Sequence, residues 1–145
     1  MTKNYLKLQF YSLARNQAFA RDAVAAFALE LNPSLSDISD IKTAVSEAVT
    51  NCTVHAYKGN LGLITIECEI TENSLHIKVS DTGKGIPNVE QAIQPFYTTL
   101  PDDERSGMGF TIMQTFMDEF RVNSVQGEGT VVYMVKCFKP EVENA

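Results

Sequence analysis

The sequence predicts an α+β fold, a two-layer sandwich in which helices cover one face of a mixed, mostly antiparallel sheet. Three observations support this prediction. Apolar residues alternate at period two near the start of the chain, they recur at helical spacing in three other segments, and a turn sequence joins two adjacent alternating runs. The length suits one domain, residues 1–140, followed by an acidic tail at 141–145.

The N-terminal part of the chain predicts one strand and two helices. Alternation at residues 6–10 is typical of an edge or interface strand. A helix is predicted over residues 16–31, where an Asn-Pro pair ends it. Its apolar stripe consists of Phe19, Ala23, Val24, Phe27 and Leu31. Ser36, Asp37 and Ser39 offer N-cap oxygens for a second helix. Its inner stripe consists of Ile41, Ala44, Val45, Ala48 and Cys52.

A hairpin, a long irregular stretch, a third helix and two closing strands are predicted next. Alternating residues at 64–70 and 75–79 flank a polar turn. After Asp81, about twenty-five residues show no periodicity, which is too long for a passive connector and predicts a functional loop or lid. A third helix opens at Gly107 and Gly109, and the last strands are joined at residues 126–129. The stripe of this helix consists of Phe110, Met113, Phe116, Met117 and Phe120.

Composition narrows the classes of function. Twelve basic against eighteen acidic side chains give a net charge of −6, and no dense Lys/Arg stripe is present, which argues against direct binding to nucleic acid. The three cysteines form no CxxC motif, which argues against a disulfide framework or a zinc site and favours a cytoplasmic location. No signal-like or membrane-spanning run is expected.

Glu47 and Asn51 lie four residues apart, so both project from the same side of the second helix, at the border of its buried stripe. A carboxylate placed there can accept a proton, and an amide oxygen can ligate a hard cation such as Mg²⁺. The same spacing is common on solvated helices. These two residues alone therefore leave a functional and a purely structural interpretation open.

Asp81 continues the parity of the apolar residues at 75–79, which directs its side chain toward the covered face of the sheet. A buried carboxylate needs donors from backbone, water or a ligand, because burying it unpaired is costly. Gly83 and Gly85 follow, and backbone without side chains allows a flat ligand to approach closely. The alternative is that the strand ends early and Asp81 caps the turn.

Ser106, Gly107, Met108 and Gly109 precede the third helix. A glycine-rich turn into a helix presents free amide donors and the positive end of the helix dipole, which suits a phosphate. The segment is neither a GxxxxGK[ST] loop nor a GxGxxG turn after a strand, and a glycine pair is also typical of an ordinary tight turn. Together with Asp81, it predicts a pocket for an anion of nucleotide size.

Taken together, Glu47-x-x-x-Asn51, Asp81-x-Gly83-x-Gly85, the lid and Gly107-x-Gly109 resemble the ATP-binding signature of the GHKL superfamily, which includes gyrase, Hsp90, MutL and histidine kinases. More narrowly, the segments 18–21, 45–51 and 104–113 resemble the anti-sigma-F factors of spore-forming bacteria, a family of small serine protein kinases. The resemblance covers nearly the whole chain except the tail. It implies the Bergerat fold with an ATP lid.

The resemblance implies ATP or ADP and Mg²⁺ as ligands and gives each motif a role. Asp81 would bind the adenine amino group, and Thr130 would support the same end through its hydroxyl, while the glycines after Asp81 would let the base lie against the backbone. Asn51 would hold Mg²⁺. Glu47 would be the general base. The other residues implied at the nucleotide are Thr98, Thr99, Ser106, Gly107, Met108, Gly109, Phe110 and Arg105, the last also acting in catalysis.

The resemblance also implies protein partners. The chain would form a homodimer, bind a sporulation sigma factor when ATP is present, and phosphorylate a serine of an anti-anti-sigma factor. Arg21, Glu104 and Arg105 would contact both protein ligands, so the two would compete. Two alternatives stay open: a nucleotide-gated sigma-binding module that transfers no phosphate, and a stand-alone catalytic domain of the histidine-kinase type.

Overall fold

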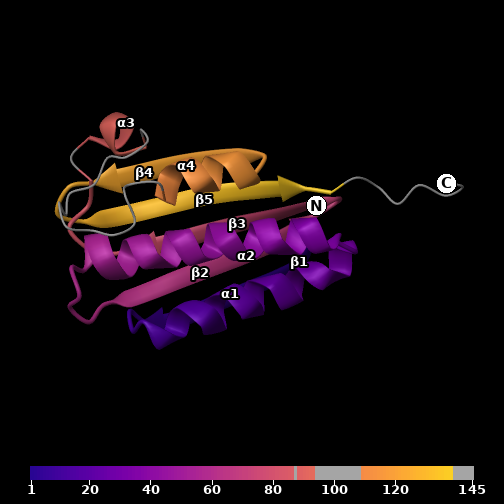
Figure 1. Ribbon diagram of the computed structural model, residues 1–145, viewed down its shortest axis with the longest axis horizontal. Coiled ribbons are helices and arrows are strands. Elements are labelled where there is room, and N and C mark those ends of the chain that lie inside the picture. Colours follow the sequence, from indigo (N-terminus) through magenta and orange to yellow (C-terminus); the bar gives the residue numbers. More distant parts are fainter. Residues whose placement is uncertain (87, 94–108, 139–145) are drawn as a thin grey trace, which may run out of the picture.

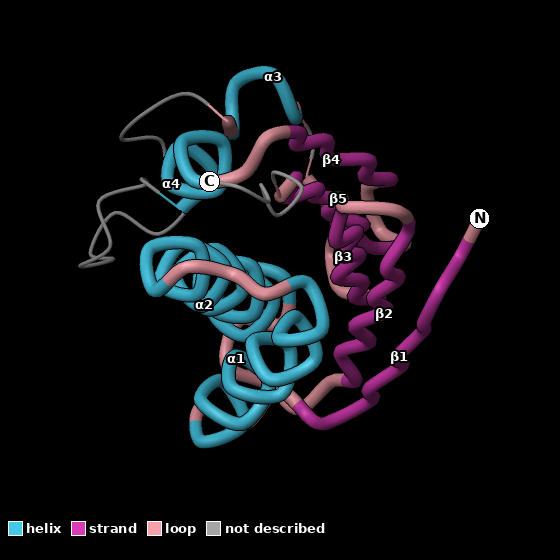
Figure 2. Tube along the Cα trace, turned by 90° about the vertical axis from the view of Figure 1, so that its right-hand side faces the viewer, coloured by secondary structure: helices cyan, strands magenta, loops and turns pink. Residues whose placement is uncertain are grey.

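The computed structural model describes residues 1–86, 88–93 and 109–138. One sheet has the strand order β1-β2-β3-β5-β4, and its four pairings are antiparallel. Figure 1 and Figure 2 show α1, α2 and α4 together in a layer against one face of this sheet, which confirms the predicted sandwich. The elements are β1 (Thr2–Tyr11), α1 (Arg15–Phe27), the 3₁₀ turn η1 (Ala28–Leu31), α2 (Leu35–Thr50), the π-helical turn η2 (Asn51–Ala56), β2 (Leu63–Thr71), β3 (Ser74–Asp81), α3 (Val89–Ala92), α4 (Gly109–Phe116), β4 (Glu119–Val125) and β5 (Gly129–Cys137).

The core lies between the two layers. The hairpin of β2 and β3 has the predicted alternation, with Ile66 opposite Val79 and Ile70 opposite Leu75. These side chains are buried against the inner stripe of α2. Burying one such aliphatic side chain contributes about 1.5–3 kcal/mol. The strength of this packing fixes the register of β3 and therefore the direction in which Asp81 points.

The first two helices differ from the prediction in detail. Phe19 was predicted in the buried stripe of α1, but it is 56% exposed. Small residues form the buried face instead, because Ala20, Val24 and Ala28 let α1 approach the core closely. The predicted N-caps of α2 were also wrong. Ser34 is the N-cap: its side chain accepts the Asp37 N–H at 3.0 Å, while the Asp37 carboxylate accepts the Ser34 N–H at 3.2 Å. Ser34 and Asp37 thus form a capping box, in which each side chain accepts the backbone N–H of the other residue.

The C-terminal half contains two further differences. Phe120 was predicted on the third helix, but α4 ends at Phe116 and Phe120 belongs to β4. Its ring contacts Phe110 of α4, with centroids 5.7 Å apart, so it still packs beside the predicted stripe. The stretch predicted to be irregular contains the short helix α3, capped by the Asn88 side chain. The predicted helix start at Gly107 and the tail lie outside the described residues.

The three cysteines are free, as the sequence predicted. No helix within the described ranges is long and apolar enough to cross a membrane.

Candidate functional site

Helix α2 carries Glu47 and Asn51. The helix extends to Thr50, and Asn51 keeps helical dihedral angles of φ −60° and ψ −38°. The two side chains therefore lie one turn apart on the same side of the helix, as their spacing predicted. Both are half-buried, and the alanine between them, Ala48, is fully buried against the core. A carboxylate and an amide oxygen thus sit where the helix surface meets the interior.

The helix widens into a π-helical turn at Asn51, which the sequence did not predict. In η2 the backbone N–H of Tyr57 bonds to the carbonyl of Cys52, five residues earlier, at 3.0 Å. Such turns occur mostly as single wide turns within helices and often at functional sites. Here the wide turn brings Cys52, which is only 3% exposed, against the end of β3.

Asp81 lies at the end of β3 and is 8% exposed, so its side chain points inward as the strand parity predicted. Its Oδ1 accepts the Gly83 N–H at 2.9 Å. Burial raises the pKa of Asp81 above 3.8, and hydrogen bonds from the Gly83 backbone, the Cys52 thiol and the Thr130 backbone oppose that rise. The structure therefore combines a buried carboxylate with several donors that favour its charged form.

Cys52 is a side-chain neighbour of Asp81 that sequence reasoning missed. Burial raises the pKa of the Cys52 thiol well above 9.0, and the adjacent charge of Asp81 raises it further. The thiol therefore stays protonated at neutral pH and can act as a donor toward the adjacent carboxylate. The only signal in the sequence was the position of Cys52 on the inner stripe of the second helix, which predicts burial but no polar contact.

The loop after Asp81 is held from two sides. The Lys84 N–H bonds to the Ala56 carbonyl of η2 at 3.2 Å, and the Gly127 N–H of the β4–β5 turn bonds to the Lys84 carbonyl at 2.6 Å. A Cβ atom at Gly83 would lie 2.5 Å from the Ala56 oxygen, and Gly85 has φ +77°. Both glycines are thus required by contacts within the chain, while their predicted approach to a flat ligand stays a prediction.

Thr130 lies beside Asp81 on β5, as its register partner. Its Oγ1 is 2.8 Å from Ser124 Oγ, and Ser124 Oγ also donates to the Gly129 carbonyl at 3.0 Å. The same Ser124 oxygen accepts the Ile86 N–H at 2.7 Å. Ser124 of β4 therefore links this strand to β5 and to the loop after β3 by hydrogen bonds. These bonds lie beside the buried carboxylate of Asp81.

Helix α4 packs against α2. Gly109 and Met113 are buried, and Phe110 is half-buried against the core. The Lys136 ammonium, on β5, bonds to the carbonyl of Phe116 at 2.9 Å and to the Asp40 carboxylate at 3.1 Å, which fixes the end of α4 to α2. The predicted site residues that lie outside the described ranges are Thr98, Thr99, Glu104, Arg105, Ser106, Gly107 and Met108.

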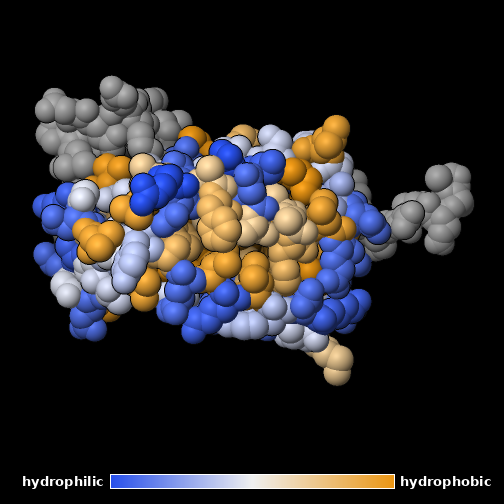
Figure 3. All heavy atoms as spheres, turned by 90° about the horizontal axis from the view of Figure 1, so that it is seen from below, coloured by the Kyte–Doolittle hydropathy of each residue, from blue (hydrophilic) through white to orange (hydrophobic). Residues whose placement is uncertain are grey.

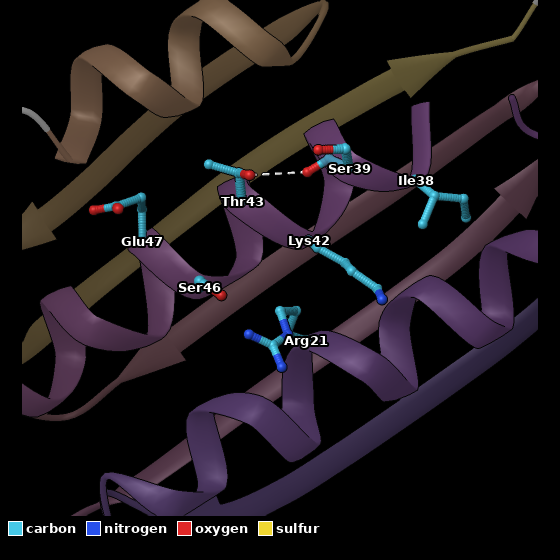
Figure 4. Close-up of a pocket in the computed structure, with 7 residues that line it drawn as sticks. All are labelled: Arg21, Ile38, Ser39, Lys42, Thr43, Ser46 and Glu47. Atoms are coloured by element: carbon cyan, nitrogen blue, oxygen red, sulfur yellow. Dashed lines mark hydrogen bonds between the residues drawn. The ribbon is translucent and has the colours of Figure 1, made fainter. Parts of the chain in front are cut away.

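An open groove of about 560 Å³ runs between α1 and α2 and reaches Glu47. Figure 4 shows Arg21 of α1 and Lys42 of α2 projecting into the space between the helices, with Ser46 beside them. Asp22 pairs with both cations, 3.2 Å from Arg21 Nε and 3.7 Å from Lys42 Nζ. The remaining lining residues are Ile38, Ser39 and Thr43. Sequence reasoning had singled out Arg21 but not the groove.

The donor set near Asn51 suits Mg²⁺ better than a transition metal. No group of three His, Cys, Asp or Glu side chains occurs among residues 1–86, 88–93 and 109–138. Mg²⁺ commonly takes one or two protein oxygens and keeps several waters or phosphate oxygens. A single amide oxygen at Asn51 fits this pattern.

Comparison with known proteins shows the family to which the chain belongs. Residues 10–136 match a family model described as a histidine kinase-like ATPase domain. The chain is 56% identical over 133 residues to an anti-sigma F factor of Caldanaerobacter subterraneus subsp. tengcongensis, covering 92% of this chain and 93% of the relative. It is 52% identical over 139 residues to an anti-sigma F factor of Clostridium beijerinckii, covering 95% and 97%.

Solved structures share the fold at low identity. The RsbU and RsbW domains of Rv1364c from Mycobacterium tuberculosis match with a TM-score of 0.66 and 18% identity, over 93% of this chain and 32% of that one. The catalytic domain of histidine kinase ThkA matches with a TM-score of 0.59 and 18% identity, over 91% and 95%. The second match extends the likeness to nearly the full length of an isolated catalytic domain.

Proposed function

Because the chain belongs to the anti-sigma F factor family and carries a histidine kinase-like ATPase domain, we propose that it is an ATP-dependent serine kinase that also binds a sporulation sigma factor. The observation that carries the proposal is the buried carboxylate of Asp81, held by several donors at the end of β3. Such a group is well suited to recognise a ligand that brings further N–H donors.

The adenine amino group is such a ligand, because it carries two N–H donors. Asp81 offers carboxylate oxygens, and its neighbour Thr130 offers a hydroxyl oxygen. Since Ser124 Oγ uses its own hydrogen on the Gly129 carbonyl, the Thr130 hydroxyl donates to Ser124 and keeps acceptor capacity on its oxygen. Two acceptors of this kind select adenine over guanine, whose corresponding position is a carbonyl.

The other end of the nucleotide would meet α2 and α4. We propose that Asn51 holds the Mg²⁺ that accompanies ATP, which neutralises charge on the phosphates. Backbone amides at the start of α4, beginning with Gly109 and Phe110, would bind the phosphates. The proposal also includes the sequence-predicted contacts of Thr98, Thr99, Arg105, Ser106, Gly107 and Met108.

Glu47 is the proposed general base. Its carboxylate would accept the proton of a serine hydroxyl as the serine oxygen bonds to the γ-phosphorus. The bond from that phosphorus to the bridging oxygen breaks, and ADP leaves with the electron pair. Positioning and charge neutralisation supply most of such catalysis, and a positioned base typically contributes about 10²–10⁴-fold. The half-buried place of Glu47 beside the groove supports this role.

The groove at Arg21 and Lys42 is the proposed docking place for the protein ligands. Arg21 and Lys42, which share Asp22 as an ion-pair partner, and several hydroxyls offer contacts to an acidic segment. A substrate bound there would have its serine near Glu47, at the end of the groove. The sigma factor and the anti-anti-sigma factor would compete for Arg21, with Glu104 and Arg105 as further contacts.

A homodimer is part of the proposal. Figure 3 looks onto the side of the molecule formed by α1 and β1, where apolar side chains gather in a patch bordered by hydrophilic ones. Strand β1 is at the edge of the sheet, which leaves one side of its backbone open to a partner. The exposed apolar and aromatic residues of β1, α1 and η1 include Tyr5, Tyr11, Phe19 and Leu29, each more than half exposed.

The test is to incubate the protein with γ-labelled ATP, Mg²⁺ and candidate anti-anti-sigma proteins, and to identify the labelled residue. Acid-stable phosphoserine on the partner, reduced at least about 100-fold in Glu47→Gln, is the expected result. Glu119→Gln is the matched control, because Glu119 is exposed on β4. Acid-labile phosphohistidine would instead identify a histidine-kinase activity. An ATP-dependent complex without label would identify a binding module.

A further inference from the structure

Tyr57 follows the π-helical turn directly, and its hydroxyl joins two distant segments. The Tyr57 hydroxyl donates to the Leu63 carbonyl at 2.6 Å and accepts the Thr82 N–H at 2.8 Å. Thr82 Oγ1 lies 3.3 Å from the same oxygen. The ring is half-buried against the hydrophobic core. One side chain therefore connects η2, the first residue of β2 and the residue after Asp81.

Three successive N–H groups of the loop are anchored in this way. The Thr82 N–H bonds to Tyr57, the Gly83 N–H bonds to the Asp81 carboxylate at 2.9 Å, and the Lys84 N–H bonds to the Ala56 carbonyl at 3.2 Å. Two of these three partners are Ala56, the last residue of η2, and Tyr57, which follows it. The orientation of the Asp81 carboxylate is thus coupled to the position of Tyr57 through one peptide.

The surrounding chain accommodates this ring. A Cβ atom added at Gly62 would overlap the Tyr57 ring, so only glycine leaves room for it at that position. Gly62 itself is held by Ser12, whose Oγ accepts the Gly62 N–H at 2.9 Å and whose N–H bonds to the Gly62 carbonyl at 2.8 Å. The place of the ring is therefore fixed by backbone on one side and by the core on the other.

We propose that Tyr57 is a positioning residue for base recognition: its hydroxyl holds residues 82–84 in the conformation that presents the Asp81 carboxylate to the nucleotide. This inference rests on the proposed function, since it concerns the same nucleotide site. Tyr57 acts through the loop and not on the ligand. Removing the hydroxyl lowers the fraction of molecules whose loop is competent to bind, and apparent affinity falls by that fraction.

The test measures ATP, ADP and GTP affinity by calorimetry for the wild type, Tyr57→Phe and Tyr133→Phe. The control removes a hydroxyl that bonds to His76 Nδ1 at 2.7 Å, on the face of the sheet away from the helices. Tyr57→Phe is expected to weaken ATP and ADP equally, by about fivefold, and to reduce the preference for ATP over GTP. The Thr82 amide should also exchange its hydrogen faster than in the wild type. The control should change none of these.

If the wild type binds ATP and Tyr57→Phe has the same affinities and the same base preference, the role of Tyr57 is overturned. The proposed function is then unaffected. A wild type that binds neither ATP nor ADP would overturn the proposed function and this inference with it. Should Tyr57→Phe not fold, Gly62→Ala displaces the ring while retaining the hydroxyl. That variant is expected to lose base preference in the same way, and a folded Gly62→Ala protein with wild-type preference would contradict the proposal.

Discussion

The thiol of Cys52 lies against the carboxylate of Asp81, and both side chains are buried where the helical layer meets the end of β3. The residue before this cysteine is Asn51, the proposed ligand of Mg²⁺. The two proposed ends of the nucleotide site are therefore linked by adjacent residues of η2.

This contact predicts the effect of changing Cys52. Cys52→Ser retains a donor, whereas Cys52→Ala leaves the buried carboxylate one donor short, so Ala should be less stable than Ser by about 1–2 kcal/mol in urea unfolding. Cys68 is the matched control, because burial alone raises its pKa to about 12. There the order should reverse, since Ser places an unpaired hydroxyl in the core. The same order at both positions would contradict the assigned contact.

The buried state of Asp81 predicts a pH dependence of stability. Its pKa is raised above 3.8, chiefly by burial, so folding favours the protonated form. The associated stability is fully present below the unfolded pKa and is lost as pH rises through the folded pKa. Asp81→Asn should therefore stabilise the nucleotide-free protein relative to wild type by a margin that grows from acidic to neutral pH, while weakening ATP binding. Urea unfolding across that pH range measures the margin, and a constant margin would refute the explanation.

Lys136 predicts a stability link between α2 and α4. Lys136→Met removes the bonds to Asp40 and to the Phe116 carbonyl, and should cost about 2–4 kcal/mol because both partners lose a buried charge-assisted contact. Adding Asp40→Asn should recover part of this loss. Lys78→Met is the control, since its pair with Glu67 is exposed and should contribute less than about 1 kcal/mol. Equal losses from the two lysines would contradict the prediction.

Asn51 predicts the metal dependence of binding. In Asn51→Ala, ATP should still bind, but the ratio of affinities measured with and without Mg²⁺ should fall toward one, because an oxygen ligand has been removed. Asn123→Ala is the control, because Asn123 is exposed on β4. A wild-type ratio in Asn51→Ala would remove Asn51 from the metal site.

The sequence predicted those features that depend on strong periodicity. The alternation of apolar residues at 64–70 and 75–79 predicted the hairpin. The position of Asp81 in that alternation predicted that its side chain is buried. Periodicity failed where a contact between elements imitates one element. Phe120 stands at helical spacing after Met117, yet it belongs to β4, and its ring meets that of Phe110 from the sheet.

Other features leave no local signal. The predicted N-caps Ser36, Asp37 and Ser39 all carry side chains that can cap a helix. Ser34 is the N-cap of α2 because it exchanges hydrogen bonds with Asp37. The contact of Cys52 with Asp81 and that of Tyr57 with Thr82 join residues 25 or more positions apart in the sequence. Long-range partners of this kind are set by the packing of η2 against β3.

The wide turn at residues 51–56 stores one residue of slack in the chain. Tyr57 follows this turn directly, and Asn51 begins it. Deleting one residue within the turn, such as Thr53, would change the position of Tyr57 relative to α2, while Glu47, upstream, would keep its place. The length of this turn therefore sets how the proposed general base lies relative to the residues that hold the loop after Asp81.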